Sequence, residues 1–229
     1  MLHRLSMSVG AVVMAAGAGR RIGGRPKGLL MREGMPLIER QLRALSEVGI
    51  THAVVVLGHH AERIEPVLKA LKSVLAPQLD LCWAMNARPD DGPGSSLRTG
   101  LAALPSELDA VLVALADQPL LAPPDIQAVL HAWQQRARSV RLVVPVFEGQ
   151  PGHPVILDAA VRADIMAQSG GTGLRDWRRE HAAQVQLMAV DHPRYTLDID
   201  SEADRAGLQA CWGIMLTWPE DLSGPDVGG

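Results

Sequence analysis

Short apolar runs alternate with longer amphipathic segments along most of the 229-residue chain. Continuously apolar runs bounded by glycine, proline or charge are typical of strands buried on both faces of a sheet. Amphipathic stretches such as residues 36–48, with Leu37, Ile38, Leu42 and Leu45 on one face, are typical of helices. The predicted strands are 9–15, 53–57, 79–84, 110–116, 142–146, 154–157 and 185–190. The predicted helices are 36–48, 61–75, one from Ser95 or Ser96, 123–135, one between the strand at 154–157 and the Gly-Gly-Thr-Gly turn at 170–173, and one after Ser201.

This alternation predicts an α/β fold, a three-layer α/β/α arrangement around a mostly parallel, Rossmann-like sheet. Neither an internal repeat nor a long linker divides the chain, so a single domain over residues 1–216 is expected. Residues 217–229 are rich in proline, glycine and aspartate and are expected to form a flexible tail. In such folds a ligand binds beyond the carboxyl ends of the strands.

Composition narrows the class of protein. A formal net charge of −3 gives no basic field, so nucleic-acid binding driven by charge is not expected. No apolar run reaches the roughly 18 residues of a membrane span, so no membrane association is expected either. Met1 to Ala18 has the outline of a secretory signal, but its apolar core is short and Arg20 and Arg21 follow at once, which favours a cytoplasmic protein. Two cysteines without metal-ligand spacing are expected to be buried structural thiols.

The first predicted strand leads into a glycine-rich loop, residues 17–27, that also carries Arg20, Arg21 and Lys27. Glycines let backbone N–H groups approach a ligand, and the cations can neutralise an anion held there, which suits a nucleoside triphosphate. A dinucleotide-binding loop also has this glycine spacing, but the acidic residue required about 20 positions later is missing. A P-loop is excluded because no Gly-Lys-Ser/Thr follows. Solvated loop charge is the alternative interpretation of the three cations.

Five segments in order, spread over residues 12–208, together resemble the MobA-like NTP transferase family, which includes the molybdenum cofactor transferases. They are Ala15-Ala16-Gly17-x-Gly19-x-Arg21-x-Gly23-Gly24-x-Pro26-Lys27, Gly94-Ser95-Ser96-Leu97, Ala116-Asp117-Gln118-Pro119, Gly152-His153-Pro154 and Leu197-Asp198-Ile199-Asp200-Ser201. Glu202 and Asp204 continue the last segment, but Ala203 and its neighbours depart from the Pro-Glu order of the family pattern. The Ala-Ala-Gly start is similar to the cytidylyltransferase branch, whereas the guanylyl branch usually has Ala-Gly-Gly.

The resemblance implies a Mg²⁺-dependent enzyme, with Mn²⁺ as the alternative ion, that transfers CMP from CTP to the phosphate of molybdopterin and releases pyrophosphate. A molybdoenzyme or its maturation factor is a further candidate partner. Implied catalytic residues are Lys27, Arg21 and Asp117, and implied metal ligands are Asp117, Asp200 and Asp198. Implied nucleotide or acceptor contacts are Ala15, Ala16, Gly17, Gly19, Arg20, Lys27, Gly94, Ser95, Ser96 and His153, the last of them orienting the pterin.

Several alternatives stay open at this stage. Asp117 also suits a turn before proline, Ser95 and Ser96 suit helix caps, and Asp198 or Asp200 could cap the final helix. The same chemistry could act on a sugar phosphate, a polyol phosphate or a phospholactate. A non-catalytic chaperone that carries the cofactor and a nicotinamide-dependent oxidoreductase are the remaining classes.

Overall fold

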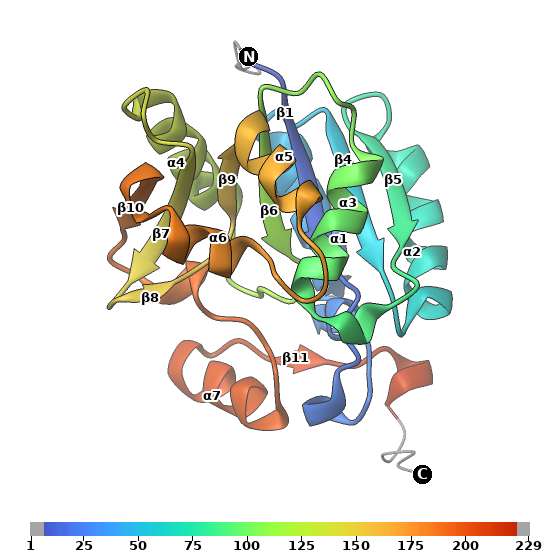
Figure 1. Cartoon of the computed structure of the whole chain (residues 1–229). Helices are drawn as coiled ribbons and strands as arrows, with labels where there is room; N and C mark the ends of the chain where they lie inside the picture. The colour runs from blue at the N-terminus through green and yellow to red at the C-terminus, as the bar shows by residue number, and fades with distance from the viewer. Residues whose placement is uncertain (1–6, 224–229) are drawn as a thin grey trace.

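The computed structural model describes residues 7–223 and shows a central eight-stranded sheet with helices on both faces (Figure 1). The strand order is β10-β7-β9-β6-β1-β4-β5, and β8 pairs with β7. The strands are β1 (Val9–Met14), β4 (His52–Leu57), β5 (Asp80–Met85), β6 (Ala110–Leu115), β7 (Leu142–Phe147), β8 (Gln150–Pro151), β9 (Val155–Asp158) and β10 (Val185–Ala189). The predicted three-layer, mostly parallel sheet is therefore confirmed.

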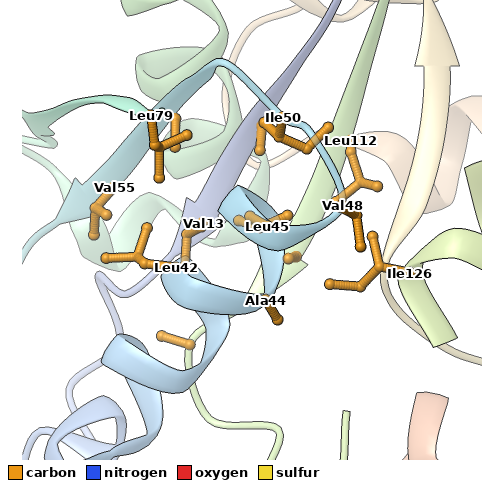
Figure 2. Packing of buried hydrophobic residues seen from close by; sticks show 14 of the residues in the cluster. Val13, Leu42, Ala44, Leu45, Val48, Ile50, Val55, Leu79, Leu112 and Ile126 are labelled. Carbon is orange, nitrogen blue, oxygen red and sulfur yellow. The ribbon is translucent and has the colours of Figure 1, made fainter. Parts of the chain in front are cut away.

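Helices cover the sheet in two groups that follow from the alternation of side chains along the strands. In β1, Ala11 and Val13 belong to one hydrophobic cluster with α1 (Leu37–Glu47), α2 (Ala61–Leu75) and α4 (Pro123–Gln135). Figure 2 shows part of this cluster, where the apolar face of α1 packs on the sheet. Val12 faces the other way, toward α3 (Pro93–Ala103), α5 (Ala159–Ala167) and α6 (Leu174–Glu180). Every buried strand thus has apolar neighbours on both sides.

Some elements differ from the expectation. Strand β9 runs antiparallel to both β6 and β7, and α6 follows the Gly-Gly-Thr-Gly turn, where no helix was expected. Neither cysteine is buried, because Cys82 is half-buried and Cys211 is exposed. Among the described residues, no helix is long and apolar enough to cross a membrane.

A second, small sheet joins distant parts of the chain. It pairs β2 (Met31–Arg32) with β3 (Met35–Pro36) and with β11 (Leu216–Thr217). Residues 217–223, expected to belong to a flexible tail, instead include half of β11 and the short helix η6 (Glu220–Leu222), from which Asp221 pairs with Arg63 at 2.9 Å. Residues 224–229 lie outside the described part of the chain.

The sheet brings distant segments to one edge. Strands β1 and β6 are parallel neighbours, so the glycine-rich loop and Asp117 both follow carboxyl ends. The loop holds two short 3-10 helices, η1 (Arg20–Ile22) and η2 (Lys27–Leu29). The backbone N–H of Ile199 donates to the carbonyl of Asp117 at 3.2 Å, which places residues 198–200 beside the end of β6.

Candidate active site

A cleft of about 320 Å³ opens at this edge of the sheet. Many of the residues expected from the sequence line it, namely Ala15, Ala16, Gly17, Lys27, Ser96, Asp117 and Asp198, together with Pro26, Gly28, Pro89, Gly92 and Pro93. The cleft therefore brings together four of the five segments that the sequence analysis singled out.

The glycine-rich loop is held in shape by its own backbone and by neighbouring loops. Gly19 has a left-handed φ of 62°, and its carbonyl accepts from the N–H groups of Ile22 at 2.9 Å and Gly24 at 3.0 Å. A Cβ at Gly19 would overlap the carbonyl oxygen of Arg25, so a side chain there is excluded both by conformation and by space. His60 Nε2 lies 3.0 Å from the carbonyl of Ala18, which fixes the loop to the turn after β4.

Three carboxylates gather opposite this loop. Asp117, Asp198 and Asp200, here called the carboxylate cluster, each offer one oxygen, and these oxygens lie within 4.8 Å of one another. Asp117 is 8% exposed, and burial raises its pKa, an effect that Lys27 only partly offsets. The pKa of Asp198 is also raised, first by burial and then by the negative charges of Asp117 and Asp200. Repulsion between like charges this close is relieved by a neighbouring cation or by a proton on one of the carboxyls.

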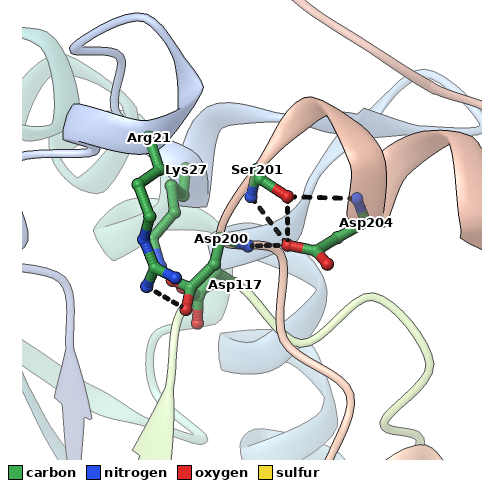
Figure 3. A network of polar contacts seen from close by, with 6 residues as sticks. All are labelled: Arg21, Lys27, Asp117, Asp200, Ser201 and Asp204. Carbon is green, nitrogen blue, oxygen red and sulfur yellow. Dashed lines mark hydrogen bonds and ion pairs between the residues drawn. The ribbon is translucent and has the colours of Figure 1, made fainter.

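In this structure the cation is Lys27. Its Nζ contacts Asp117 and lies 2.7 Å from Oδ1 of Asp200, while Arg21 Nη2 lies 2.5 Å from the other oxygen of Asp200 (Figure 3). Burial lowers the pKa of Lys27, but the two carboxylates outweigh it, so the net pKa is raised. Burial acts against ionisation of Asp200, yet Lys27 and Arg21 together hold its pKa below the ordinary value. The structure thus joins Lys27 and Arg21 to the carboxylate cluster.

A helix cap fixes the position of Asp200. Asp204 Oδ2 accepts hydrogen bonds from the N–H of Asp200 at 2.9 Å, the N–H of Ser201 at 2.7 Å and the Ser201 hydroxyl at 2.8 Å (Figure 3). Ser201 in turn caps the first turn of α7 (Glu202–Trp212). Because Ser201 and Asp204 perform this capping, the carboxylate of Asp200 is left for Lys27 and Arg21, and the capping alternative for Asp200 is wrong.

The start of α3 forms the opposite side of the cleft. The helix begins at Pro93, slightly earlier than expected, and Gly94 is buried where a Cβ would overlap the carbonyl of Thr172. Ser96 is buried, and Ser95 is half-buried. Both serines contact Asn86, a buried residue at the end of β5 that the sequence analysis missed. Its position directly after a strand was the available signal.

Several of the expected residues do not line the cleft, Arg20 and His153 among them. Arg20 is exposed and pairs with Asp90 at 2.9 Å across the loops. His153 is half-buried, and burial together with the nearby charge of Arg178 lowers its pKa to about 4. Its carbonyl accepts from Gln118 Nε2 at 3.3 Å, so His153 is connected to the residue that follows Asp117. Gln118 was also missed as a structural link.

A doubly covered α/β sheet in which a glycine-rich cationic loop faces a carboxylate cluster is the arrangement of a nucleotidyltransferase. The comparison with known families agrees with this class. The chain belongs to the MobA-like NTP transferase domain family, whose sequence profile matches residues 11–198. The family membership expected from the five segments is therefore confirmed.

Individual proteins are similar to this chain in sequence or in fold. The chain is 32% identical over 184 residues to the bifunctional protein GlmU of Mycobacterium ulcerans, with 78% of this chain and 37% of that protein covered. The chain thus spans little more than a third of this curated relative. A nucleotidyl transferase from Methanothermobacter thermautotroptrophicus has a similar fold, with a TM-score of 0.70, 23% identity and coverage of 90% and 97% of the two chains. Rv0371c from Mycobacterium tuberculosis, solved in complex with manganese, is similar with a TM-score of 0.66, 22% identity and coverage of 89% and 99%.

Proposed function

We propose that this nucleotidyltransferase transfers CMP from CTP to the terminal phosphate of molybdopterin and releases pyrophosphate. The observation that carries the proposal is the carboxylate cluster, held by Lys27 and Arg21 directly beside the glycine-rich loop. The Ala15-Ala16-Gly17 start of the loop supports cytidine as the base. The recipient of the product would be a molybdoenzyme or its maturation factor.

The residues fit a divalent cation. Mg²⁺ prefers carboxylate oxygens together with substrate phosphates, and Mn²⁺ accepts the same ligands. The buried Asp117 and the half-buried Asp198 and Asp200 supply three such oxygens within 4.8 Å of one another. Bound there, the ion would neutralise charge on the α-phosphate and orient it. The manganese complex of the structurally similar Rv0371c supports this assignment.

The reaction needs little acid–base chemistry from the protein. A phosphate oxygen of the acceptor forms a bond to the α-phosphorus of CTP, and the bond from that phosphorus to the β-phosphate oxygen breaks. Because the attacking oxygen is already anionic, no proton must be removed by a base, and the developing charge leaves on pyrophosphate. Alignment and charge neutralisation then provide the catalysis.

The chain's own residues divide this work. Gly17 and Lys27 of the glycine-rich loop line one wall of the cleft, and this wall suits the triphosphate. When a divalent ion satisfies the carboxylates, the Lys27 ammonium and the exposed Arg21 are free to bind phosphate oxygens. His153 has a pKa of about 4, so it is neutral at pH 7 and suits a hydrogen-bonding role toward the acceptor rather than that of a cation.

The test is a thermal-shift panel of CTP, GTP, ATP and UTP with Mg²⁺, followed by an assay of pyrophosphate release. We expect CTP to stabilise most, and molybdopterin to release pyrophosphate where sugar and polyol phosphates do not. Asp117→Asn should abolish turnover while the protein stays folded. Turnover with another nucleotide or acceptor, or strong Mg²⁺-dependent turnover in Asp117→Asn, would contradict the proposal.

A further inference from the structure

Arg178 of α6 carries a guanidinium group that has no partner in the structure. The residue is half-buried, and within residues 7–223 its side chain makes no hydrogen bond and no ion pair. The adjacent Arg179, by contrast, is 74% exposed and pairs with Asp176 at 3.2 Å. Removing a cation partly from water without a carboxylate beside it is costly. An unpaired cation of this kind indicates a place where an anion binds.

The side of α6 that carries Arg178 packs against the central sheet. Leu174, Trp177 and Arg178 share this side because of their helical spacing. Trp177 is buried in one hydrophobic cluster with Val155 of β9, and Leu174 packs against the same cluster. Arg178 therefore lies near the start of β9, whereas Arg179 lies on the outer side of the helix.

The start of β9 is at the same edge of the sheet as the carboxylate cluster. Because β9 runs antiparallel to β6, the residues before β9 adjoin the residues after β6. His153 and Asp117 consequently lie beyond the same end of this pair of strands, and the carbonyl of His153 accepts from Gln118 at 3.3 Å. Burial lowers the pKa of His153, and the charge of Arg178 adds to this effect, which agrees with a position of Arg178 close to His153.

The turn that leads into α6 touches the wall of the cleft. The carbonyl of Thr172 accepts from Arg98 Nη1 at 2.8 Å, and a Cβ at Gly94 would overlap the same carbonyl. Arg98 and Gly94 belong to α3, whose first turn lines the cleft. Arg178 itself does not line the cleft, so an anion bound to it would lie beside the nucleotide and not in its place.

The reaction brings two phosphate groups to the carboxylate cluster, and each needs a cation. Lys27 is assigned to the triphosphate, and its segment packs through Leu29 on the face of the sheet that α1, α2 and α4 cover. Helix α6 lies on the opposite face with α3 and α5 (Figure 1). The acceptor phosphate carries about −1.5 to −2 charges at pH 7, and Arg178 offers it a cation from this opposite layer.

We propose that Arg178 binds the phosphate group of the acceptor. The inference rests on the proposed function and extends it to the second substrate. A planar guanidinium holds two oxygens of a phosphate monoester, so the third oxygen stays free to attack the α-phosphorus. The ligand class is therefore a phosphate monoester, and an acceptor without a phosphate group is not recognised at this position.

Binding of inorganic phosphate tests the site apart from turnover. Calorimetry uses the full chain saturated with CTP, which fills the triphosphate site, and a chelator, because transfer needs the divalent ion. Arg178→Met should weaken phosphate binding about tenfold or more, since charge-assisted hydrogen bonds are lost. Arg178→Lys keeps the charge without the planar group and should give an intermediate affinity.

Arg179→Met is the matched control, because it removes the neighbouring cation from the outer side of the same helix. Its phosphate affinity should stay within about twofold of the wild type. Unfolding temperatures without phosphate separate binding from a structural role. Arg178 has no partner to lose within residues 7–223, so Arg178→Met should be at least as stable as the wild type, whereas loss of a structural arginine would lower the unfolding temperature.

Pyrophosphate release measures the same site during turnover. With molybdopterin as the acceptor, Arg178→Met should raise the KM for molybdopterin about tenfold and leave the KM for CTP within about twofold. No phosphate binding to the wild type, equal binding to wild type and Arg178→Met, or an acceptor KM that does not rise selectively would overturn the inference, while the proposed function would stand.

The proposed function can also fail by itself. If Arg178→Met loses phosphate binding but the wild type releases no pyrophosphate with molybdopterin, the phosphate site stands and the proposed acceptor is wrong. Failure of the wild type to bind CTP would overturn the proposed function and the inference that rests on it.

Discussion

Replacing Lys27 by methionine removes the cation that neutralises the carboxylate cluster while keeping most of its volume. The Lys27 side chain is 19% exposed, and that of its partner Asp117 is 11% exposed. Breaking a buried ion pair from one side costs about 3–5 kcal/mol, because the other charge remains buried. Asp200 is 35% exposed and keeps Arg21, so the lower limit applies. We expect Lys27→Met to destabilise the apoprotein by about 3 kcal/mol at pH 8, or about 6–12 °C in unfolding temperature.

The pKa shifts predict how the loss of stability in Lys27→Met changes with pH. The pKa of Lys27 is raised in the folded state, so its contribution is complete below the unfolded pKa and is lost only as the pH rises through the folded value. In the variant, burial raises the pKa of Asp117 with no lysine to oppose it. A carboxyl with a raised folded pKa destabilises the protein above the ordinary pKa and not below it. The difference between wild type and variant should therefore shrink as the pH falls from 8 toward 4.

Urea unfolding at pH 8 and pH 5 measures both effects. Lys69→Met is the matched control, since Lys69 is 64% exposed and pairs with Glu65 on the surface of α2, where the loss should be under about 0.5 kcal/mol. Adding Asp117→Asn to Lys27→Met removes the stranded charge and should restore most of the lost stability. A loss below about 1 kcal/mol at pH 8, an equal loss at both pH values, or no rescue by Asp117→Asn would refute the electrostatic reasoning.

Three further predictions follow from individual contacts. Gly94→Ala places a Cβ against the backbone carbonyl of Thr172, so thermal unfolding should show a loss of stability of about 1–3 kcal/mol. Gly207→Ala is the control, because a Cβ there meets open space on α7, and it should be neutral or stabilising by up to about 1 kcal/mol. Asp204→Ala removes three hydrogen bonds to Asp200 and Ser201, so it should lower the free energy of unfolding by about 1–2 kcal/mol. It should also weaken Mn²⁺ binding measured by calorimetry, because Asp204 holds Asp200 in position. An unchanged Mn²⁺ affinity would show that Asp204 does not position Asp200 for the ion. His153 has a folded pKa of about 4, so its contribution to stability is complete above pH 6.5 and is lost as the pH falls to 4. His153→Gln should flatten this part of the stability–pH curve, and an unchanged slope would show that the pKa of His153 is not lowered in the folded protein.

The central strands β1 and β6 were predictable because they are apolar throughout, as burial on both faces demands. The direction of each strand relative to its neighbours was not predictable. Strand β9 is apolar like its parallel neighbours, with Val155, Ile156 and Leu157 all buried, yet it runs antiparallel. Periodicity depends on which faces are buried and carries no information on direction. The two-residue strands β2, β3, β8 and β11 were missed because so short a segment has no period.

Some candidate site residues could also be predicted from the sequence, and others could not. Asp117, Lys27 and the glycine-rich loop could be singled out as candidate site residues, because their residue types and their resemblance to the family can be read from short contiguous segments. The roles of Asn86 and Gln118 depend on partners far away in the chain, and no local pattern contains those partners. Asp204 is an intermediate case, because the spacing from Ser201 to Asp204 is that of a capping box and could have been read from the sequence.

The pairing of β11 with β2 has a consequence for the order in which the molecule is made. Strand β2 directly follows the segment that carries Lys27, but its partner Leu216 is among the last described residues to leave the ribosome. Leu216 is buried with Ile22 and Leu30 in one cluster, which packs the loop from the far end of the chain. A nascent chain therefore cannot complete its loop before synthesis has passed β11. A ribosome-bound fragment that ends before β11 holds the loop without the contacts that Leu216 makes.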